Sequence, residues 1–161
     1  MTTKDFNQCV DTHADGIYRF ILKNIRDEDA ARDIVQDAYT KMWEKHENIA
    51  AGKSKSYLYT AAYHTMIDYI RKRKRFYGSD TELEKQRSYE HGYSDLQEIL
   101  HEALNTLNEV QKSVLLLRDY EGYSYKEIGE IVDLNESQVK VYIYRARVAM
   151  KKYIGSMEVV I

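Results

Sequence analysis

The chain has 161 residues, 31% charged side chains and a formal net charge of −2, and this length suits one ordinary domain or two small ones. It contains no proline and only one cysteine, Cys9, so long helices are permitted and an intramolecular disulfide is excluded. Neither a signal peptide nor a run of about eighteen apolar residues is recognisable. We therefore expect an all-α protein of the cytoplasm.

Charge is distributed unevenly along the chain. Residues 71–75 carry a net charge of +5, residues 79–110 carry −6, and residues 136–155 carry +4. Because salt screens exposed charges beyond about 8 Å, the local field decides whether a surface attracts a polyanion. The two basic segments are therefore candidate nucleic-acid sites, although each is also compatible with an ordinary solvated helix face.

Apolar residues in the first half recur at helical spacing. They predict one helix over residues 6–25 and a second over residues 30–42, which follows acidic residues that favour a helix N-terminus. After a loop over residues 46–55, a third helix begins at Ser54 or Ser56 and ends in the basic block. The expected inward residues are Phe6, Val10, Ile17, Ile21, Ile25, Ala30, Ile34, Ala38, Met42, Leu58, Ala61, Ala62, Thr65 and Tyr69.

The middle of the chain is polar and rich in turn residues. Residues 76–94 lack a sustained apolar stripe, which is typical of a linker. Helical patterns return over residues 96–107 and again over residues 110–117. We therefore predict two small helical domains joined by a flexible linker, with boundaries at 1–77, 78–94 and 95–161.

The last part of the chain contains a predicted helix-turn-helix. Ser124 and Glu127 form a capping box before a short helix, the segment DLN makes a turn, and Asn135 with Gln138 begins a longer helix. The buried residues are expected to be Ile128, Ile131, Val139, Ile143, Ala146 and Met150. Such a second helix can enter a DNA major groove, although structural helical hairpins share the spacing. Its polar face carries Gln138, Lys140, Tyr144, Arg145 and Arg147.

Three segments in order resemble the extracytoplasmic-function sigma factors of the sigma-seventy class. DIVQDAYTKMW is similar to the polymerase-clamp segment of that family, SYLYTAAYHTMIDYIRKRKR to its minus-ten segment, and LLLRDYEGYSYKEIGEIVDLNESQVKVYIYRARVAMKKY to its minus-thirty-five segment. The resemblance implies a protein that binds core RNA polymerase, directs it to promoters and promotes DNA opening. It also implies an anti-sigma partner and no cofactor.

The resemblance implies roles for particular residues. The residues implied to contact the largest polymerase subunits are Asp33, Gln36, Asp37 and Trp43. The opened minus-ten strand needs cations for its phosphates and neighbouring side chains for its bases. The residues that the resemblance implies for this role are Lys53, Lys55, Tyr59, Tyr63, His64, Arg71, Lys72, Arg73, Lys74 and Arg75. The residues implied to bind minus-thirty-five DNA are Gln138, Lys140, Val141, Tyr144, Arg145 and Arg147.

The sequence departs from the family pattern at two places. His64 stands where asparagine is frequent, and a histidine ring presents different hydrogen-bonding groups to a base. Val141 and Tyr142 stand where a small polar residue and an arginine are frequent, so Val141 offers only apolar contact, for example with a thymine methyl. The family's promoter consensus therefore does not transfer directly to this chain.

Three other classes compete with this interpretation. A stand-alone helix-turn-helix regulator explains residues 95–155 but not the first two motifs. A helical adaptor without a nucleic-acid role would use both basic clusters only as solubilising surface. An enzyme is disfavoured because the five histidines are scattered and no phosphate-binding glycine loop is present. Asp33 and Asp37 share a helix face without a third ligand, so we expect neither a catalytic nor a metal site.

Overall fold

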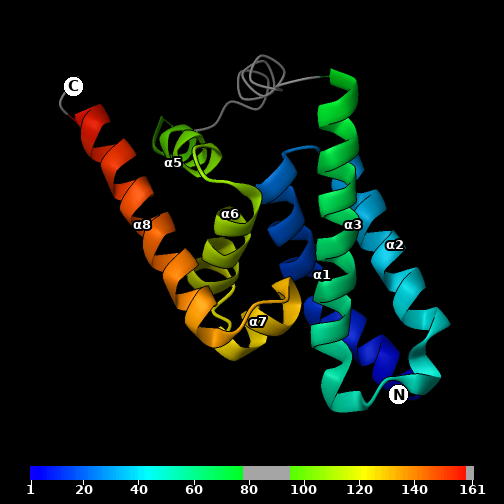
Figure 1. Ribbon diagram of the computed structural model, residues 1–161. Coiled ribbons are helices and arrows are strands. Elements are labelled where there is room, and N and C mark those ends of the chain that lie inside the picture. The colour runs from blue at the N-terminus through cyan, green and yellow to red at the C-terminus, as the bar shows by residue number, and fades with distance from the viewer. Residues whose placement is uncertain (78–94, 159–161) are drawn as a thin grey trace.

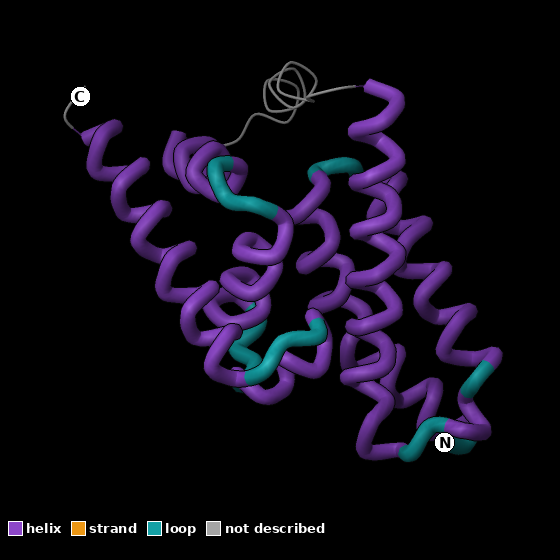
Figure 2. Tube along the Cα trace, viewed as in Figure 1, coloured by secondary structure: helices purple, strands orange, loops and turns teal. Residues whose placement is uncertain are grey.

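The protein is built from helices that form two bodies, as the ribbon in Figure 1 shows. The computed structural model describes residues 1–77 and 95–158, with side chains up to residue 156, and all regular structure in these ranges is helical (Figure 2). The all-α prediction is confirmed. The predicted linker, residues 78–94, lies outside the described residues.

The first body is a bundle of three long helices. They are α1 (Thr3–Ile25), α2 (Glu28–Glu44) and α3 (Ser54–Tyr77), with the short turns η1 (His46–Asn48) and η2 (Ala51–Lys53) between the last two. Side-chain caps fix where the first two begin: Thr2 forms a capping box with Asp5, and the Asp27 carboxylate accepts a hydrogen bond from the amide of Ala30. The third begins at Ser54, one of the two starting residues that the sequence predicted.

The core of this bundle follows the predicted apolar stripes. The side chains of Ile17, Ile21, Met42 and Leu58 are fully buried, and Phe6 and Val10 pack against the core from its edge. Steps of three, four and seven residues place one side chain after another on the same helix face, which is why periodicity alone located this core.

The second body contains the helix-turn-helix. Its elements are α5 (Asp95–Asn105), α6 (Glu109–Leu115), the π-helical turn η3 (Leu116–Tyr120), α7 (Tyr125–Val132) and α8 (Glu136–Glu158). Asn108 caps α6 through a capping box with Gln111. The long helix α8 packs against α5, α6 and α7, and its residues Val139, Ile143 and Ala146 are buried as predicted.

The two bodies pack against each other and share one continuous core, which the sequence did not reveal. Helix α3 lies against α7, and α1 lies against α6 and η3. The buried Lys112 ammonium donates hydrogen bonds to the Asn24 carbonyl and to Asn105 Oδ1, both at 2.9 Å. Arg19 donates two hydrogen bonds to the Glu121 carboxylate, at 2.7 and 2.8 Å. Helices α2 and α8 form opposite outer edges of the pair (Figure 1).

Candidate nucleic-acid interface

The helix-turn-helix is fixed by caps and by one close backbone approach. The Ser124 hydroxyl accepts from the Glu127 amide, and Glu127 Oε1 accepts from the Ser124 amide, both at 3.1 Å. The turn that follows has Asp133 in the left-handed conformation, with φ +60°. There the chain folds back on Gly129, where a Cβ atom would lie 2.4 Å from the Leu134 carbonyl oxygen. Only glycine therefore suits position 129.

The second helix of the motif, α8, separates its buried and exposed rows clearly. Lys140, Val141, Tyr144 and Arg145 all project from the exposed side, and Tyr144 retains 70% of its accessible surface. This row combines donors for phosphates and base edges with an apolar contact. It is the arrangement expected of a helix that lies in a major groove.

Two other residues predicted for this face have structural partners. Gln138 Oε1 accepts a hydrogen bond from the Asn135 amide at 3.0 Å, so its side chain caps α8. Arg147 donates two hydrogen bonds to Asp119, at 2.5 and 3.2 Å, and the Asp119 carboxylate raises the pKa of the guanidinium. Both side chains are exposed but already engaged. Their contacts with DNA remain predictions.

The basic end of α3 forms a second cationic surface. Arg71, Lys72 and Arg75 are exposed along the last turns of the helix. Arg73 donates to the Tyr69 hydroxyl at 3.2 Å, and Lys74 forms a 2.6 Å ion pair with Glu109 of the second body. His64 is exposed on the same helix.

Two further cations lie at the start of α3, and both contact α7: Lys53 ends η2, and Lys55 lies in the first turn of α3 rather than in the loop. Lys53 lies 3.7 Å from the Glu130 carboxylate, and Lys55 forms an ion pair with Glu127. The Lys55 ammonium also lies over the Tyr123 ring, 4.4 Å from its centroid. The start of α3 therefore meets the acidic side of the helix-turn-helix.

The two tyrosines predicted to hold the minus-ten strand are buried. Tyr59 has no exposed surface and packs edge-on against Tyr123 of the second body, with ring centroids 5.1 Å apart. Burial raises the pKa of the Tyr59 hydroxyl and that of Tyr63. In this arrangement neither side chain is accessible to DNA, and their predicted role in holding the strand stays a prediction.

The predicted polymerase contact is one continuous exposed face of α2. Asp33, Gln36 and Asp37 point to the outside, and Trp43, about two turns after Gln36, continues the face with 42% of its surface accessible. Asp37 forms a 3.2 Å ion pair with Lys41. The Trp43 ring stacks on His46 at 4.1 Å between centroids, which fixes its orientation.

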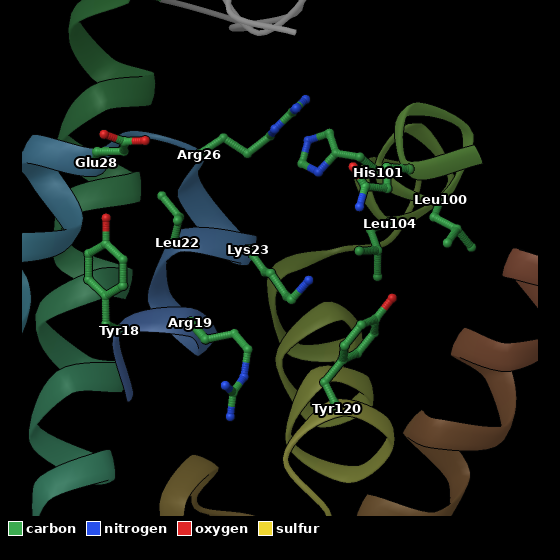
Figure 3. Close-up of a pocket in the computed structure, with 11 residues that line it drawn as sticks. Tyr18, Arg19, Leu22, Lys23, Arg26, Glu28, Leu100, His101, Leu104 and Tyr120 are labelled. Atoms are coloured by element: carbon green, nitrogen blue, oxygen red, sulfur yellow. The ribbon is translucent and has the colours of Figure 1, made fainter. Parts of the chain in front are cut away.

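A cavity of about 340 Å³ lies at the seam between α1 and α5. Leu22, Lys23 and Arg26 line one side, and Leu104 and His101 line the other (Figure 3). Burial, together with the nearby Arg26 charge, lowers the pKa of His101 to about 3, so its ring is neutral at physiological pH. None of the residues predicted to bind DNA or polymerase lines this cavity.

Residues 1–77 and 95–158 contain no cluster of three or more potential metal ligands. The same residues include no helix that is long and apolar enough to span a bilayer. Two cationic faces, one of them on a helix-turn-helix, are the features of a DNA-binding protein.

Comparisons with known proteins indicate the same class, a DNA-binding protein, and also identify the protein family. The family model "Sigma-70 region 2" matches residues 9–76, and "Sigma-70, region 4" matches residues 97–150. RNA polymerase sigma factor SigV of Bacillus subtilis is 32% identical over 146 residues, which are 89% of this chain and 87% of that protein. ECF RNA polymerase sigma factor SigX of the same organism is 26% identical and covers 92% of this chain.

Solved structures have the same fold. The sigma factor RpoE of Bartonella quintana, crystallised with the anti-sigma factor NepR, is 26% identical and superposes with a TM-score of 0.75 over 95% of this chain and 98% of that one. CnrH, in complex with the cytosolic domain of CnrY, is 19% identical and superposes with a TM-score of 0.74. At this identity the likeness shows a common fold only.

This chain belongs to the sigma-70 family of RNA polymerase sigma factors, in its extracytoplasmic-function group. Its function is promoter-specific initiation of transcription together with RNA polymerase. The family interpretation made from the three sequence motifs is therefore confirmed, whereas the roles of individual residues remain predictions.

Proposed function

We propose that this sigma factor divides its work among three surfaces. The exposed face of α2, with Asp33, Gln36, Asp37 and Trp43, binds the largest subunits of core RNA polymerase. Two carboxylates and a carboxamide offer hydrogen-bond acceptors and donors, and the half-exposed indole offers apolar area of the kind that anchors protein interfaces. Its location on an outer edge of the molecule supports this assignment, since a large partner can approach it without rearrangement (Figure 1).

The minus-ten strand is assigned to α3 and the loop before it. The cations of residues 71–75 hold phosphates, and His64 contacts a base. Lys55, in the first turn of the helix, and Lys53, just before it, extend the cationic track at its start. Single-stranded DNA is bound in this way elsewhere, by a basic track with neighbouring rings or polar pockets.

The minus-thirty-five element is assigned to α8. The observation that carries this assignment is the exposed row formed by Lys140, Val141, Tyr144 and Arg145 on a helix whose opposite side is buried. Both caps of the motif are formed, so this row is held rigidly. A rigid helix with donors along one side is what major-groove recognition needs.

Regulation and location follow from the family. RpoE of Bartonella quintana was crystallised with an anti-sigma factor, and we assign an anti-sigma partner to this chain as well. The protein acts in the cytoplasm on promoter DNA, requires no cofactor or metal, and catalyses no reaction of its own.

In vitro transcription tests the proposal. Purified core polymerase and a genomic promoter library are incubated with and without the chain, and specific initiation is expected only in its presence. A variant with Asp33→Asn, Gln36→Ala and Asp37→Asn should lose binding to core polymerase in a pull-down and retain its helical circular dichroism. Equal initiation without the chain would overturn the function, and unchanged polymerase binding would overturn the α2 assignment.

A further inference from the structure

The single tryptophan of the chain lies at the end of α2 and has aromatic rings on two sides. Trp43 is the penultimate residue of the helix, and 42% of its surface is accessible. The His46 ring of η1 stacks on the indole, with 4.1 Å between the ring centroids and 9° between the ring planes. The Phe6 ring of α1 meets the indole edge-on, with centroids 5.0 Å apart. Two elements besides α2 therefore hold this side chain.

A hydrogen bond holds His46 in the stacked position. Its Nδ1 atom lies 2.5 Å from the Trp43 carbonyl oxygen, and because a carbonyl can only accept, Nδ1 carries the proton. The short helix η1 is anchored as well, since the Ile49 amide donates to the His46 carbonyl at 3.2 Å and the Ile49 side chain is buried. The imidazole is therefore a fixed part of the surface beside the indole.

Phe6 is fixed on the other side of the indole. It lies in the first turns of α1, which begins at the capping box between Thr2 and Asp5, and its side chain packs against the core. The start of α1 and the end of α2 lie at the same end of the bundle (Figure 1). Stacked and edge-on ring pairs both have preferred geometries, so the two contacts together give the indole one orientation.

We propose that Phe6 and His46 are positioning residues for polymerase binding, which hold the Trp43 indole in the orientation in which it enters an apolar pocket of core polymerase. A partly exposed tryptophan with a fixed ring is the kind of side chain that anchors protein interfaces. The polar residues of the α2 face then form the rim of the contact. The inference rests on the polymerase-binding role proposed above, and it adds how the anchor is oriented and what kind of site receives it.

Holding the ring before association raises the affinity, because less conformational freedom is lost on binding. Immobilising a side chain at an interface costs free energy, and a side chain that is already fixed avoids that cost. Release of the indole should therefore weaken binding to core polymerase by roughly three- to ten-fold. Removal of the indole should weaken binding further, because the contact itself is then lost.

The test uses full-length variants and purified core polymerase. His46→Ala removes the stacked ring together with its hydrogen bond, and Phe6→Leu removes the edge-on ring but keeps an apolar side chain. His46→Phe is the conservative variant, because it places a flat ring beside the indole again. Glu47→Ala changes an exposed neighbour in η1 and is the matched control. Helical circular dichroism checks that each variant is folded.

Two measurements separate the orientation of the indole from polymerase binding. Because the chain has one tryptophan, fluorescence excited where its 15 tyrosines do not absorb reports Trp43 alone. The anisotropy decay of this fluorescence and its quenching by acrylamide show, without polymerase, how freely the indole moves. The affinity of the same variants for immobilised core polymerase is then measured.

The expected result links the two measurements. His46→Ala and Phe6→Leu should each give a more mobile indole and roughly three- to ten-fold weaker binding to polymerase. His46→Phe should recover both properties, and Glu47→Ala should change neither. In a Trp43→Ala background His46→Ala should have no further effect, because a positioning residue acts only through the ring that it positions.

The contrary outcomes distinguish this inference from the proposed polymerase-binding face. An unchanged indole in His46→Ala, or a mobile indole with unchanged polymerase affinity, overturns the inference and leaves the role of Trp43 standing. A further loss from His46→Ala in the Trp43→Ala background also overturns it, since His46 then contacts polymerase itself. Unchanged affinity in Trp43→Ala alone overturns the assignment of Trp43 to polymerase and, with it, the inference.

Discussion

Lys55 and Glu127 meet across the seam between the two bodies, and Glu127 also stabilises its own body. Glu127 Oε1 completes the capping box at the start of α7, while Oε2 faces the Lys55 ammonium. Lys55 lies in the first turn of α3 and also lies over the Tyr123 ring. One ion pair thus connects the helix-turn-helix to the start of the helix assigned to the minus-ten strand.

Glu127→Gln should change how stability depends on pH. Its ion pair with Lys55, followed by the Ser124 amide, holds the pKa of the Glu127 carboxyl below its ordinary value of 4.5. The unfolded chain therefore takes up this proton first as the pH falls, and the stabilisation is complete above pH 4.5 and is lost below it. Because the pair is partly exposed, the effect is at most about 1 kcal/mol.

Urea unfolding at pH 7 and at about pH 3.5 measures this difference. The wild-type free energy of unfolding should fall more between the two values than that of Glu127→Gln. Equal losses in both proteins would contradict a stabilising role for the pair.

Gly129→Ala should unfold the second body more easily. The new methyl group would lie 2.4 Å from the Leu134 carbonyl oxygen, and neither backbone segment can move without disturbing the turn. We expect a loss of about 1–3 kcal/mol in the free energy of unfolding. Gly155→Ala is the control, because nothing lies within 4 Å of its Cβ and alanine favours a helix; a comparable loss there would contradict the steric argument.

Lys112→Met should weaken the packing of the two bodies. The ammonium is buried and donates to the Asn24 carbonyl at the end of α1, so its removal leaves a buried acceptor without that partner. The expected cost is about 1–3 kcal/mol in thermal or urea unfolding. The exposed Lys126→Met should stay within about 0.5 kcal/mol of wild type. Similar values for the two variants would show that the buried contact is dispensable.

Arg145→Ala and Arg147→Ala should fail in different assays. Arg145 is exposed on the recognition row, so its loss should weaken binding of upstream duplex DNA by about 1–3 kcal/mol and leave polymerase association intact. Arg147 is bound to Asp119, so its loss should lower the free energy of unfolding. Holoenzyme binding to promoter DNA, a polymerase pull-down and urea unfolding separate the two. A pull-down defect in Arg145→Ala would mean that this surface contacts polymerase.

Local features could be predicted from the sequence because they depend on neighbours in the chain. The capping boxes at Ser124 and Asn135 need only residues three positions apart, and both are present. The inward rows of the helices follow from their period, and Val139, Ile143 and Ala146 are buried as expected. The family resemblance could be recognised for the same reason, since its motifs are short and ordered.

The seam could not be predicted because its partners are far apart in the sequence. Arg19 and Glu121 are separated by 102 positions in the sequence, and Lys112 and Asn24 are separated by 88 positions. In the sequence, the charged residues among them could not be distinguished from those of an ordinary solvated surface. The tyrosines were assigned to DNA by motif alone, and only the packing of Tyr123 on Tyr59 shows that one of them is buried between the bodies.

The double engagement of Lys55 affects how mutagenesis of this protein should be interpreted. Replacing it removes a group assigned to the strand and, at the same time, an ion pair between the bodies. A defect of a Lys55 variant in a promoter-opening assay therefore combines both losses. The value of its contact with DNA is measured separately only in a background where Glu127 has already been neutralised.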